Sequence, residues 1–414
     1  MNKFFTIFSA AVMLVFSGCI SADSGKAEKA ACGARGEVKL LLPERIYAAH
    51  GVETNIYFEN IVRVINPANY VFEVQSPFGR CDMKRWRYVP SEQDPRSFKL
   101  TVRVIGDKGV AAEQDVTVEV AARTAGKDKK ISMLIVGDSL TNASVYPRQI
   151  LDLCNRPGGN PELKLIGSHA GNGRLVKKGG VAHEGYGGWT WKSFLSKWTS
   201  DKKFDTLKTR KDILYARSPF LKKGPGRPVL DMKGYFKRAN NGKAPDIIVF
   251  QLGVNDIFSA TDKNVELRIQ DIFNDMDKLL SETRKAAPDA VIGVGLPTAG
   301  ASTQDAFGKS YKSRYFRWQY KKNQHRLVEA MIEKFARHNP WGVELVPVYL
   351  NLDCENNFPA VMDNVNHGNS RRIVRLNNGV HPSREGYRQI GDTYYCWLKN
   401  VLTGQNEKPV VKTK

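Results

Sequence analysis

The stretch that decides the fold is Ile131-Ser132-Met133-Leu134-Ile135-Val136-Gly137-Asp138-Ser139-Leu140. Its first six residues form a short and almost wholly apolar run, which predicts a buried strand. Gly137-Asp138-Ser139 then ends that strand, so the Ser139 hydroxyl is expected at the carboxyl edge of a sheet, where α/β enzymes carry their chemistry. Glycine, aspartate and serine also form ordinary turns. The stretch therefore indicates a nucleophile only if partner residues follow downstream.

Strand-like and helix-like segments alternate after residue 131. Apolar runs predict strands at 131–136, 163–166, 246–252, 290–296 and 343–348. Helical spacing of apolar residues predicts helices at 146–154, 189–198, 264–285, 321–337 and 384–402. Strands that alternate with helices are typical of an α/β domain, so residues 131–402 are expected to form a parallel sheet covered on both faces.

Two insertions interrupt this alternation. Residues 201–242 are rich in lysine and glycine, and residues 299–319 include the aromatic and basic run Tyr315-Phe316-Arg317-Trp318. Long connections in such a fold are usually functional lids or disordered segments. We therefore expect both insertions to lie outside the regular alternation.

Residues 37–123 show a different pattern, with short runs in which apolar and polar residues alternate. Strands are predicted at 38–42, 54–58, 70–74, 86–89, 98–105 and 115–120. This pattern predicts a small antiparallel β-sandwich domain, joined to the α/β domain by a polar linker at 124–130. Trp86 and Tyr88 fit core positions of this domain, and the alternative is a platform on which sugars stack.

The start of the chain is typical of an exported protein. Lys3 precedes an apolar core from Phe4 to Phe16, and Ser17-Gly18-Cys19 follows. Residues 1–18 resemble a lipoprotein signal peptide, which implies cleavage before Cys19 and lipid attachment to it. Phe16 is unusual three residues before the cysteine, so ordinary signal cleavage and an uncleaved anchor stay open. The protein is expected at a bacterial membrane, facing the periplasm or the cell surface, with residues 19–36 as a tether and residues 403–414 as a polar tail.

An exported protein can form disulfides. Besides Cys19, the chain has Cys32, Cys81, Cys154, Cys354 and Cys396, an odd number. Cys154 and Cys396 lie on apolar helical patterns and are predicted to be core residues. Cys32 and Cys81 are the most plausible pair. Because no Cys-x-x-Cys or clustered histidine spacing is present, no metal site is expected.

The chain is basic, with 63 Lys and Arg against 42 Asp and Glu and a formal charge of +21. The basic residues are spread along the sequence, without zinc-ligand spacing, a basic helix or an aromatic-basic RNA motif. Nucleic acid is therefore not expected as a partner. A solvated basic surface, biased toward anionic glycans or membranes, is the preferred interpretation.

Three further motifs fall at predicted sheet edges, in the order His183-Glu184-Gly185-Tyr186-Gly187-Gly188-Trp189-Thr190, Gly253-Val254-Asn255-Asp256 and Gly379-Val380-His381-Pro382. Together with Gly137-Asp138-Ser139-Leu140 they resemble, in order, the four signature blocks of the SGNH (GDSL) hydrolase family. The resemblance covers about residues 131–402. It implies a flavodoxin-like three-layer domain with serine esterase activity and with no metal or organic cofactor.

The resemblance also implies roles for individual residues. Ser139 is the matching nucleophile, and His381 is the base that takes its proton. The oxyanion donors are the N–H of Ser139, a glycine N–H of the second block and the side chain of Asn255. Gly188 is chosen over Gly187 and Gly185 because it directly precedes the Trp189 position.

One position departs from the family pattern. An aspartate usually stands three residues before the histidine, where this chain has Asn378. In serine proteases the corresponding Asp-to-Asn change costs about 10⁴ in turnover. A Ser-His dyad, with Asn378 or a backbone oxygen orienting the imidazole, is the favoured interpretation. The alternatives are a weak, degenerate site or a replacement carboxylate from upstream, for which the candidates are Asp353, Glu355 and Asp363. Asp138 is expected to belong to the turn.

The second block resembles that of acetylxylan-esterase-like members of the family. With the export signal and the leading β-domain, this suggests an extracytoplasmic esterase that removes acetyl or similar groups from polysaccharides. A lipase or thioesterase on the same fold is one alternative, although the insertions lack a long apolar lid. A non-catalytic glycan-binding lipoprotein, with the aromatic strands as its binding surface, is the other.

Overall fold

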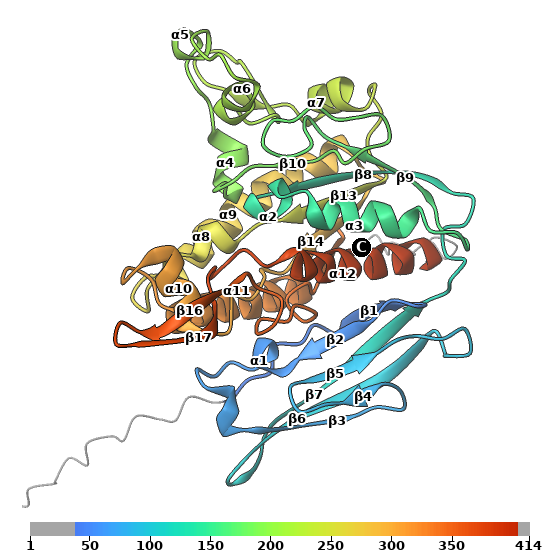
Figure 1. Cartoon of the computed structure of the whole chain (residues 1–414). Helices are drawn as coiled ribbons and strands as arrows, with labels where there is room; N and C mark the ends of the chain where they lie inside the picture. The colour runs from blue at the N-terminus through green and yellow to red at the C-terminus, as the bar shows by residue number, and fades with distance from the viewer. Residues whose placement is uncertain (1–37, 405–414) are drawn as a thin grey trace, which may run out of the picture. The chain divides into compact units, whose positions relative to one another are not determined.

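A parallel sheet lies at the centre of residues 130–404, called here the hydrolase-like region for the sequence resemblance above (Figure 1). The computed structural model describes residues 38–404. The sheet places β8 (Lys130–Gly137), β13 (Ile247–Gln251), β14 (Val291–Gly295) and β15 (Val343–Val346) side by side, while β9 (Glu162–Ile166) and β10 (Glu184–Gly185) pair with the other edge of β8. Every pairing is parallel. The order β9-β8-β13-β14-β15 is the flavodoxin-like arrangement, whose switch point lies between β8 and β13. The predicted α/β class is confirmed.

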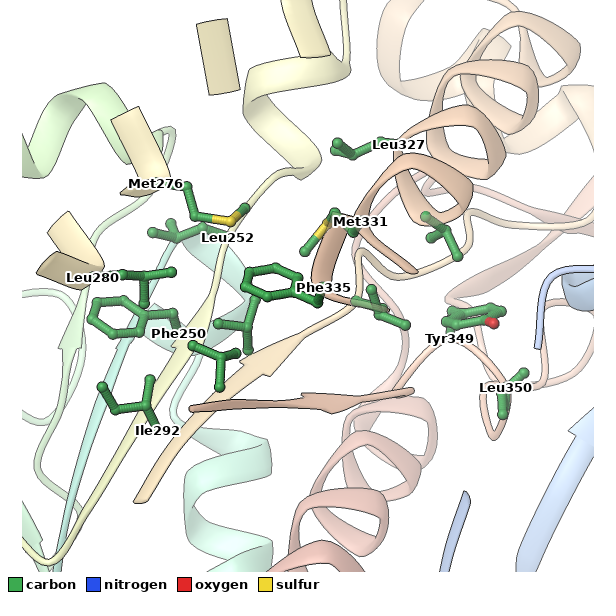
Figure 2. Packing of buried hydrophobic residues seen from close by; sticks show 14 of the residues in the cluster. Phe250, Leu252, Met276, Leu280, Ile292, Leu327, Met331, Phe335, Tyr349 and Leu350 are labelled. Atoms are coloured by element: carbon green, nitrogen blue, oxygen red, sulfur yellow. The ribbon is translucent and has the colours of Figure 1, made fainter. Parts of the chain in front are cut away.

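Helices cover both faces of this sheet, because successive strand residues point to opposite sides. Met133 and Ile135 of β8 share a core with α3 (Val145–Cys154) and α12 (Arg384–Gly404). Leu134 and Val136 share another core with α9 (Val265–Ala286) and α11 (Arg317–Arg337). Figure 2 shows part of this second core, in which Phe250 of β13 lies beside side chains of α9 and α11.

The predicted strands and helices of the sheet region are present, with shifts of a few residues at their ends. The insertions, by contrast, are largely structured. The first contains α5 (Asp201–Phe204), α6 (Arg210–Ala216), the paired strands β11 (Leu221–Lys222) and β12 (Val229–Leu230), and α7 (Met232–Ala239). The second contains α10 (Gln304–Tyr311), and α11 begins at Arg317, inside the segment expected to be a loop.

An antiparallel hairpin that the sequence did not predict follows β15. It consists of β16 (Ala360–Asn366) and β17 (Asn369–Leu376). Its side chains are mostly exposed, and Met362 and Val374 lie opposite each other on its surface. With no buried face, the segment lacks the alternating pattern by which a half-buried strand is recognised.

The N-terminal region forms two sheets. One has the order β1 (Arg45–Ala49), β7 (Gly109–Ala121), β6 (Ser97–Gly106), β3 (Val71–Gln75), and the other has the order β2 (Thr54–Tyr57), β5 (Arg85–Tyr88), β4 (Arg80–Cys81). The pairing of β1 with β7 is parallel, so the expectation of a purely antiparallel region is wrong. The strand predicted at 38–42 is also wrong, because only Leu40 forms an isolated bridge there.

Trp86 and Tyr88 are core residues of this region. Their exposed fractions are 1% and 4%. The core interpretation is therefore confirmed, and a sugar-stacking platform made by these two rings is excluded.

The N-terminal sheets and the hydrolase-like region belong to the same compact unit. The side chains of Asn55 and Asn351 are hydrogen-bonded across the boundary at 2.8 Å. The polar segment at 124–130, predicted as a linker, also takes part in packing, because the ammonium of Lys399 on α12 donates to the carbonyls of Arg123 and Ala125. The regions before and after residue 124 differ in hydrophobic pattern, yet they fold as one compact unit.

Cys154 and Cys396 are buried, as predicted, and so is Cys354. Cys81 is exposed, and its suggested partner Cys32 lies outside the described residues, so that pairing stays a prediction. The predicted signal peptide, Cys19, the tether and nearly all of the C-terminal tail also lie outside them. No helix within residues 38–404 combines the length and apolar character needed to cross a membrane.

Candidate active site

The turn between β8 and α2 (Ser139–Asn142) places Ser139 at the start of a helix. Asp138 caps this helix, since its Oδ1 accepts the N–H of Leu140 at 2.9 Å. Asp138 is fully buried, and burial raises its pKa to about 7. Gly137 allows the close approach, because a Cβ there would lie 1.9 Å from Oγ1 of Thr141. Asp138 thus lies in the turn, as expected.

Ser139 and His381 meet directly. The Nε2 of His381 lies 2.8 Å from the Oγ of Ser139, although the two residues are 242 positions apart in the chain. His381 comes from the loop between β17 and α12, and both side chains remain partly exposed. Burial lowers the pKa of His381 below its ordinary value, which favours the neutral imidazole that can accept a proton.

Asn378 holds the backbone of this loop. Its Oδ1 accepts the N–H of Val380 at 3.1 Å and the N–H of His381 at 2.9 Å. The interpretation in which the Asn378 side chain orients the imidazole ring is therefore wrong, because its oxygen is turned to the main chain. Among residues 38–404, the Nδ1 of His381 has no hydrogen-bond partner.

The three carboxylates considered as replacements have other partners. Asp353 accepts the N–H of Glu355 at 3.0 Å, while the carboxylate of Glu355 binds Lys84. Asp363 lies on the exposed hairpin, 3.7 Å from Arg375. No carboxylate in the described part of the chain is hydrogen-bonded to the histidine ring. The replacement hypothesis is therefore not supported, and the geometry is that of a dyad.

Within residues 38–404, two backbone N–H groups at or near Ser139 have no hydrogen-bond partner. That of Ser139 itself stands in the first turn of α2, where helical N–H groups have no partner within the helix. That of Gly188 donates to no group within residues 38–404. By contrast, Gly187 donates to the Tyr215 hydroxyl at 3.1 Å, and Gly185 donates to Nδ1 of His183 at 3.0 Å. Of the three glycines considered, only Gly188 keeps its N–H available to a ligand.

Asn255 lies on α8 (Val254–Ile257), directly after β13. Its Nδ2 donates to the carbonyl of Trp189 at 3.0 Å and lies 3.4 Å from Oδ2 of Asp138. The third predicted donor is thus next to the nucleophile turn, directly after the neighbouring strand β13 at the switch point. One amide hydrogen of Asn255 is therefore bonded to the Trp189 carbonyl, and the other makes only the long contact with Asp138.

A buried carboxyl group anchors the second sequence block. Glu184 on β10 has no exposed surface and accepts four hydrogen bonds, from the N–H and hydroxyl of Ser168 and from the hydroxyls of Tyr186 and Tyr235. Burial raises the pKa of Glu184, and its four donors oppose that rise. This network fixes the strand that leads into Gly187 and Gly188.

Tyr215 is a residue of the site that sequence reasoning missed. It lies on α6 in the first insertion, with its hydroxyl bonded to Gly187. A Cβ built on Gly187 would lie 3.9 Å from the Tyr215 oxygen and 4.0 Å from Cβ of Ser139, so the hydroxyl and the nucleophile both lie close to Gly187. Tyr215 belongs to no motif, and only the folding of the insertion brings it here.

Within residues 38–404, no three His, Cys, Asp or Glu side chains are grouped as ligands for a metal ion.

Residues 133–393 match the family model described as GDSL-like Lipase/Acylhydrolase, which covers more than half of the chain. No curated protein matches the sequence.

Several solved structures are similar at low sequence identity. A family 3 carbohydrate esterase from Clostridium thermocellum is 15% identical, covering 67% of this chain and 99% of its own, with a TM-score of 0.37. A family 3 carbohydrate esterase from Talaromyces cellulolyticus is 16% identical, with coverages of 66% and 98% and a TM-score of 0.34. An acetyl xylan esterase is 14% identical, with coverages of 65% and 100% and a TM-score of 0.35.

Proposed function

Because the chain belongs to the GDSL-like lipase/acylhydrolase family and is a carboxylic ester hydrolase, we propose that Ser139 and His381 are its catalytic dyad. We further propose that it removes acetyl groups from polysaccharides outside the cytoplasm. The observation that carries the first proposal is the 2.8 Å contact between Oγ and Nε2 at the carboxyl end of β8. A hydroxyl is a poor nucleophile until a base removes its proton, and the proposed base lies within hydrogen-bond distance of it.

In the first half-reaction the Oγ of Ser139 attacks the carbonyl carbon of the ester, and Nε2 of His381 takes the hydroxyl proton. The carbonyl oxygen becomes an oxyanion, which the N–H groups of Ser139 and Gly188 stabilise. The Asn255 amide hydrogen that makes only the long contact with Asp138 completes the set by donating to the oxyanion, while the other stays bonded to the carbonyl of Trp189. The bond to the alcohol oxygen then breaks, and the alcohol leaves with the proton from His381.

In the second half-reaction a water molecule replaces the alcohol. Nε2 of His381 takes one proton from the water as its oxygen attacks the acyl carbon. The second tetrahedral intermediate uses the same donors. It collapses to release the carboxylic acid, and Ser139 regains its proton from His381.

The proposal of a small acyl group on a large substrate draws on the openness of the site. Gly187 and Gly188 are exposed, and Ser139 and His381 are each partly exposed. Cavities of about 290, 340 and 370 Å³ are lined by other residues. A polymer can reach such an open edge, whereas a long acyl chain is bound best in an enclosed apolar pocket.

Two other functions fit the site less well. A lipase or thioesterase would need a long apolar acyl site, whereas the exposed Gly187, with the Tyr215 hydroxyl bonded to it, lies close to Ser139. A glycan-binding protein that uses Trp86 and Tyr88 is disfavoured because both rings are buried.

The proposed activity is tested with p-nitrophenyl acetate and p-nitrophenyl octanoate. We expect the wild type to prefer acetate, and Ser139→Ala to lose at least ~10³ in kcat. Equal rates for the wild type and Ser139→Ala would overturn the esterase assignment of this serine. A preference for octanoate would favour the lipase alternative.

The proposed location is tested separately through Cys19. If the chain is a lipoprotein, the wild type should fractionate with membranes and Cys19→Ala should appear in the soluble fraction. Identical fractionation of the two proteins would overturn the lipid anchor without affecting the esterase proposal.

A further inference from the structure

Six exposed cations lie on two chain segments near the candidate active site. We call them the basic rim, and they are Arg174, Lys177, Lys178, Lys208, Arg210 and Lys211. Within residues 38–404 none of them lies within 4.0 Å of a carboxylate oxygen, whereas many other surface cations are paired, such as Lys322 with Asp262 at 2.6 Å. Asp212, the acid next to the rim in sequence, accepts a hydrogen bond from the hydroxyl of Thr209.

The two halves of the rim are in contact. Arg174, Lys177 and Lys178 lie on the loop between β9 and β10. Lys208 lies just before α6, and Arg210 and Lys211 are its first two residues. A Cβ built on Gly173 would lie only 2.8 Å from Cα of Lys211. The Arg210 guanidinium donates to the carbonyl of Ser168 at 2.9 Å. Arg174, Arg210 and Lys211 therefore lie on two segments that pack together, and Lys177, Lys178 and Lys208 follow or precede them by at most four residues in the chain.

The loop half of the rim is tied to the helix that carries Ser139. Asn142 is the last residue of this short helix, α2. Asn142 and Asn172 exchange two hydrogen bonds of 2.8 Å each, from the Asn142 amide nitrogen and from the Asn172 backbone N–H. These bonds hold Asn172 about one helical turn from Ser139, and Arg174 comes two residues after Asn172 in the chain.

The helical half of the rim is tied to the same point through Tyr215. Lys211 and Tyr215 are one turn apart on α6, and the Lys211 ammonium lies 5.8 Å from the centre of the tyrosine ring. The Tyr215 hydroxyl accepts from the N–H of Gly187, which also lies close to Ser139. A ligand that extends from Ser139 over Gly187 to Tyr215 therefore meets Lys211 next.

We infer that the basic rim binds the carboxylates of an anionic polysaccharide, so that the proposed esterase acts on acylated acidic glycans. This inference rests on the proposed function and specifies its substrate. Unpaired like charges repel one another in the free protein, and a polymer with a regular series of carboxylates relieves that repulsion at several points. A neutral glycan would gain nothing from the six charges. The Tyr215 hydroxyl, which accepts from Gly187, keeps its own proton to donate to the sugar nearest Ser139.

The test compares O-acetylated polygalacturonate with the same polymer after methyl esterification of its carboxylates, following acetate release. We expect kcat/KM to be about tenfold higher on the acidic polymer at low salt, and the difference to vanish near ~0.5 M NaCl, where charges are screened. Equal kcat/KM on the two polymers at low salt would overturn the inference. If p-nitrophenyl acetate is still hydrolysed in that case, the proposed function stands and only the inference fails.

Charge-neutralising variants locate the effect. In Arg174→Gln/Lys211→Gln the ratio of kcat/KM between acidic and neutral polymer should fall about fivefold to tenfold. The matched control is Lys108→Gln/Lys278→Gln, which removes two exposed lysines that have no carboxylate within 4.0 Å among the described residues. The control should keep the wild-type ratio. A fall of the same size in the control would show a general charge effect and would overturn the assignment to the rim.

Binding keeps the inference testable if no turnover is found. Affinity electrophoresis of Ser139→Ala in gels with unacetylated polygalacturonate should show retardation, which salt abolishes and which the double variant reduces. Absence of retardation would overturn the inference. Retention instead on vesicles of phosphatidylglycerol and phosphatidylcholine, with none on the polymer, would assign the rim to a membrane surface and would also overturn it.

Discussion

Among the individual residues, His381 is the one whose surroundings are unusual. It binds Ser139, yet no carboxylate in the described part of the chain supports its other ring nitrogen. In a triad, the acid stabilises the imidazolium that forms during the reaction. Here burial opposes that charge and lowers the pKa of the ring. The histidine is therefore a weaker base than in a triad, but it stays neutral over a wider range of pH.

This leads to a prediction about pH. Because the proton must leave His381 before it can act as a base, kcat/KM should rise with pH through one acid limb and then level off. The lowered pKa places the midpoint of this limb below the ordinary histidine value of about 6.5, so kcat/KM should be more than half of its maximum at pH 6.5. A pH profile with p-nitrophenyl acetate checks this. A midpoint above 7 would mean that an acidic group raises the pKa of His381, contrary to the dyad.

Asn378 gives a second prediction at this scale. Its oxygen fixes two N–H groups of the His381 loop, so Asn378→Ala should reduce kcat about tenfold by loosening the histidine. Asn378→Asp keeps an oxygen acceptor at the same place and should stay within about threefold of the wild type. Steady-state kinetics of both variants, with Tm as the control for folding, make the comparison. A much larger loss in the aspartate variant would contradict the backbone role.

How far the sequence predicts the site depends on how each residue is recognised. Ser139 and His381 stand in short motifs with fixed neighbours, so they were predictable. The contact of the Asn378 oxygen with backbone N–H groups was not, because a motif records residue types and not the direction of a side chain. Tyr215 was not predictable either, since it reaches the site only through the fold of a 42-residue insertion at 201–242.

At the scale of elements, the second block depends on the short strand β10. Only Glu184 and Gly185 form this strand, and it pairs with the end of β8 next to Ser139. Two residues of strand provide little stability of their own. The hydrogen bonds of Glu184 to Ser168, Tyr186 and Tyr235 hold the block against the loop after β9 and against α7.

We therefore expect a large effect when Glu184 is changed. Glu184→Gln should lower the free energy of unfolding by about 1–3 kcal/mol, because its amide nitrogen cannot accept from Tyr186. Glu184→Ala should cost about 3–5 kcal/mol, since several buried donors lose their partner. Urea denaturation measures both. The matched control is Glu162→Gln on β9, an exposed partner of Lys130, which should change by less than about 1 kcal/mol. Equal losses of unfolding free energy in Glu184→Gln and Glu162→Gln would contradict the role of Glu184 as an anchor of β10.

The burial of side chains explains which strands and helices could be predicted from the sequence. Strands such as β8 and β13 are buried on both faces, so their apolar runs are visible in the sequence. Long helices such as α9 have an apolar stripe at helical spacing. The hairpin of β16 and β17 has neither signal because its side chains face solvent, and β10 is too short to show any period.

At the scale of the whole described molecule, the N-terminal sheets and the hydrolase region share a core. Ile56 and Trp86 of the N-terminal sheets belong to the same apolar cluster as Tyr349 and Leu350, which follow β15. A polar tie lies beside them, where the Asn60 amide donates to the carbonyls of Tyr349 and Leu352, each at 2.8 Å. The hydrophobic pattern of the sequence changes near residue 124, but this change is not a boundary between independently packed domains.

This arrangement predicts cooperative unfolding of residues on both sides of that change. Asn60 is 1% exposed, so Asn60→Ala leaves two buried carbonyls without their donor and should cost about 2–4 kcal/mol. Asn274→Ala on α9 is the control, because Asn274 is exposed and should change the free energy by less than about 0.5 kcal/mol. In urea, tryptophan fluorescence and esterase activity should be lost at one midpoint in the wild type. In Asn60→Ala both should shift together, since a shared core cannot lose one half and keep the other. Separate midpoints for the two signals, or an Asn60→Ala effect as small as that of the control, would show that the N-terminal sheets fold independently of the active site.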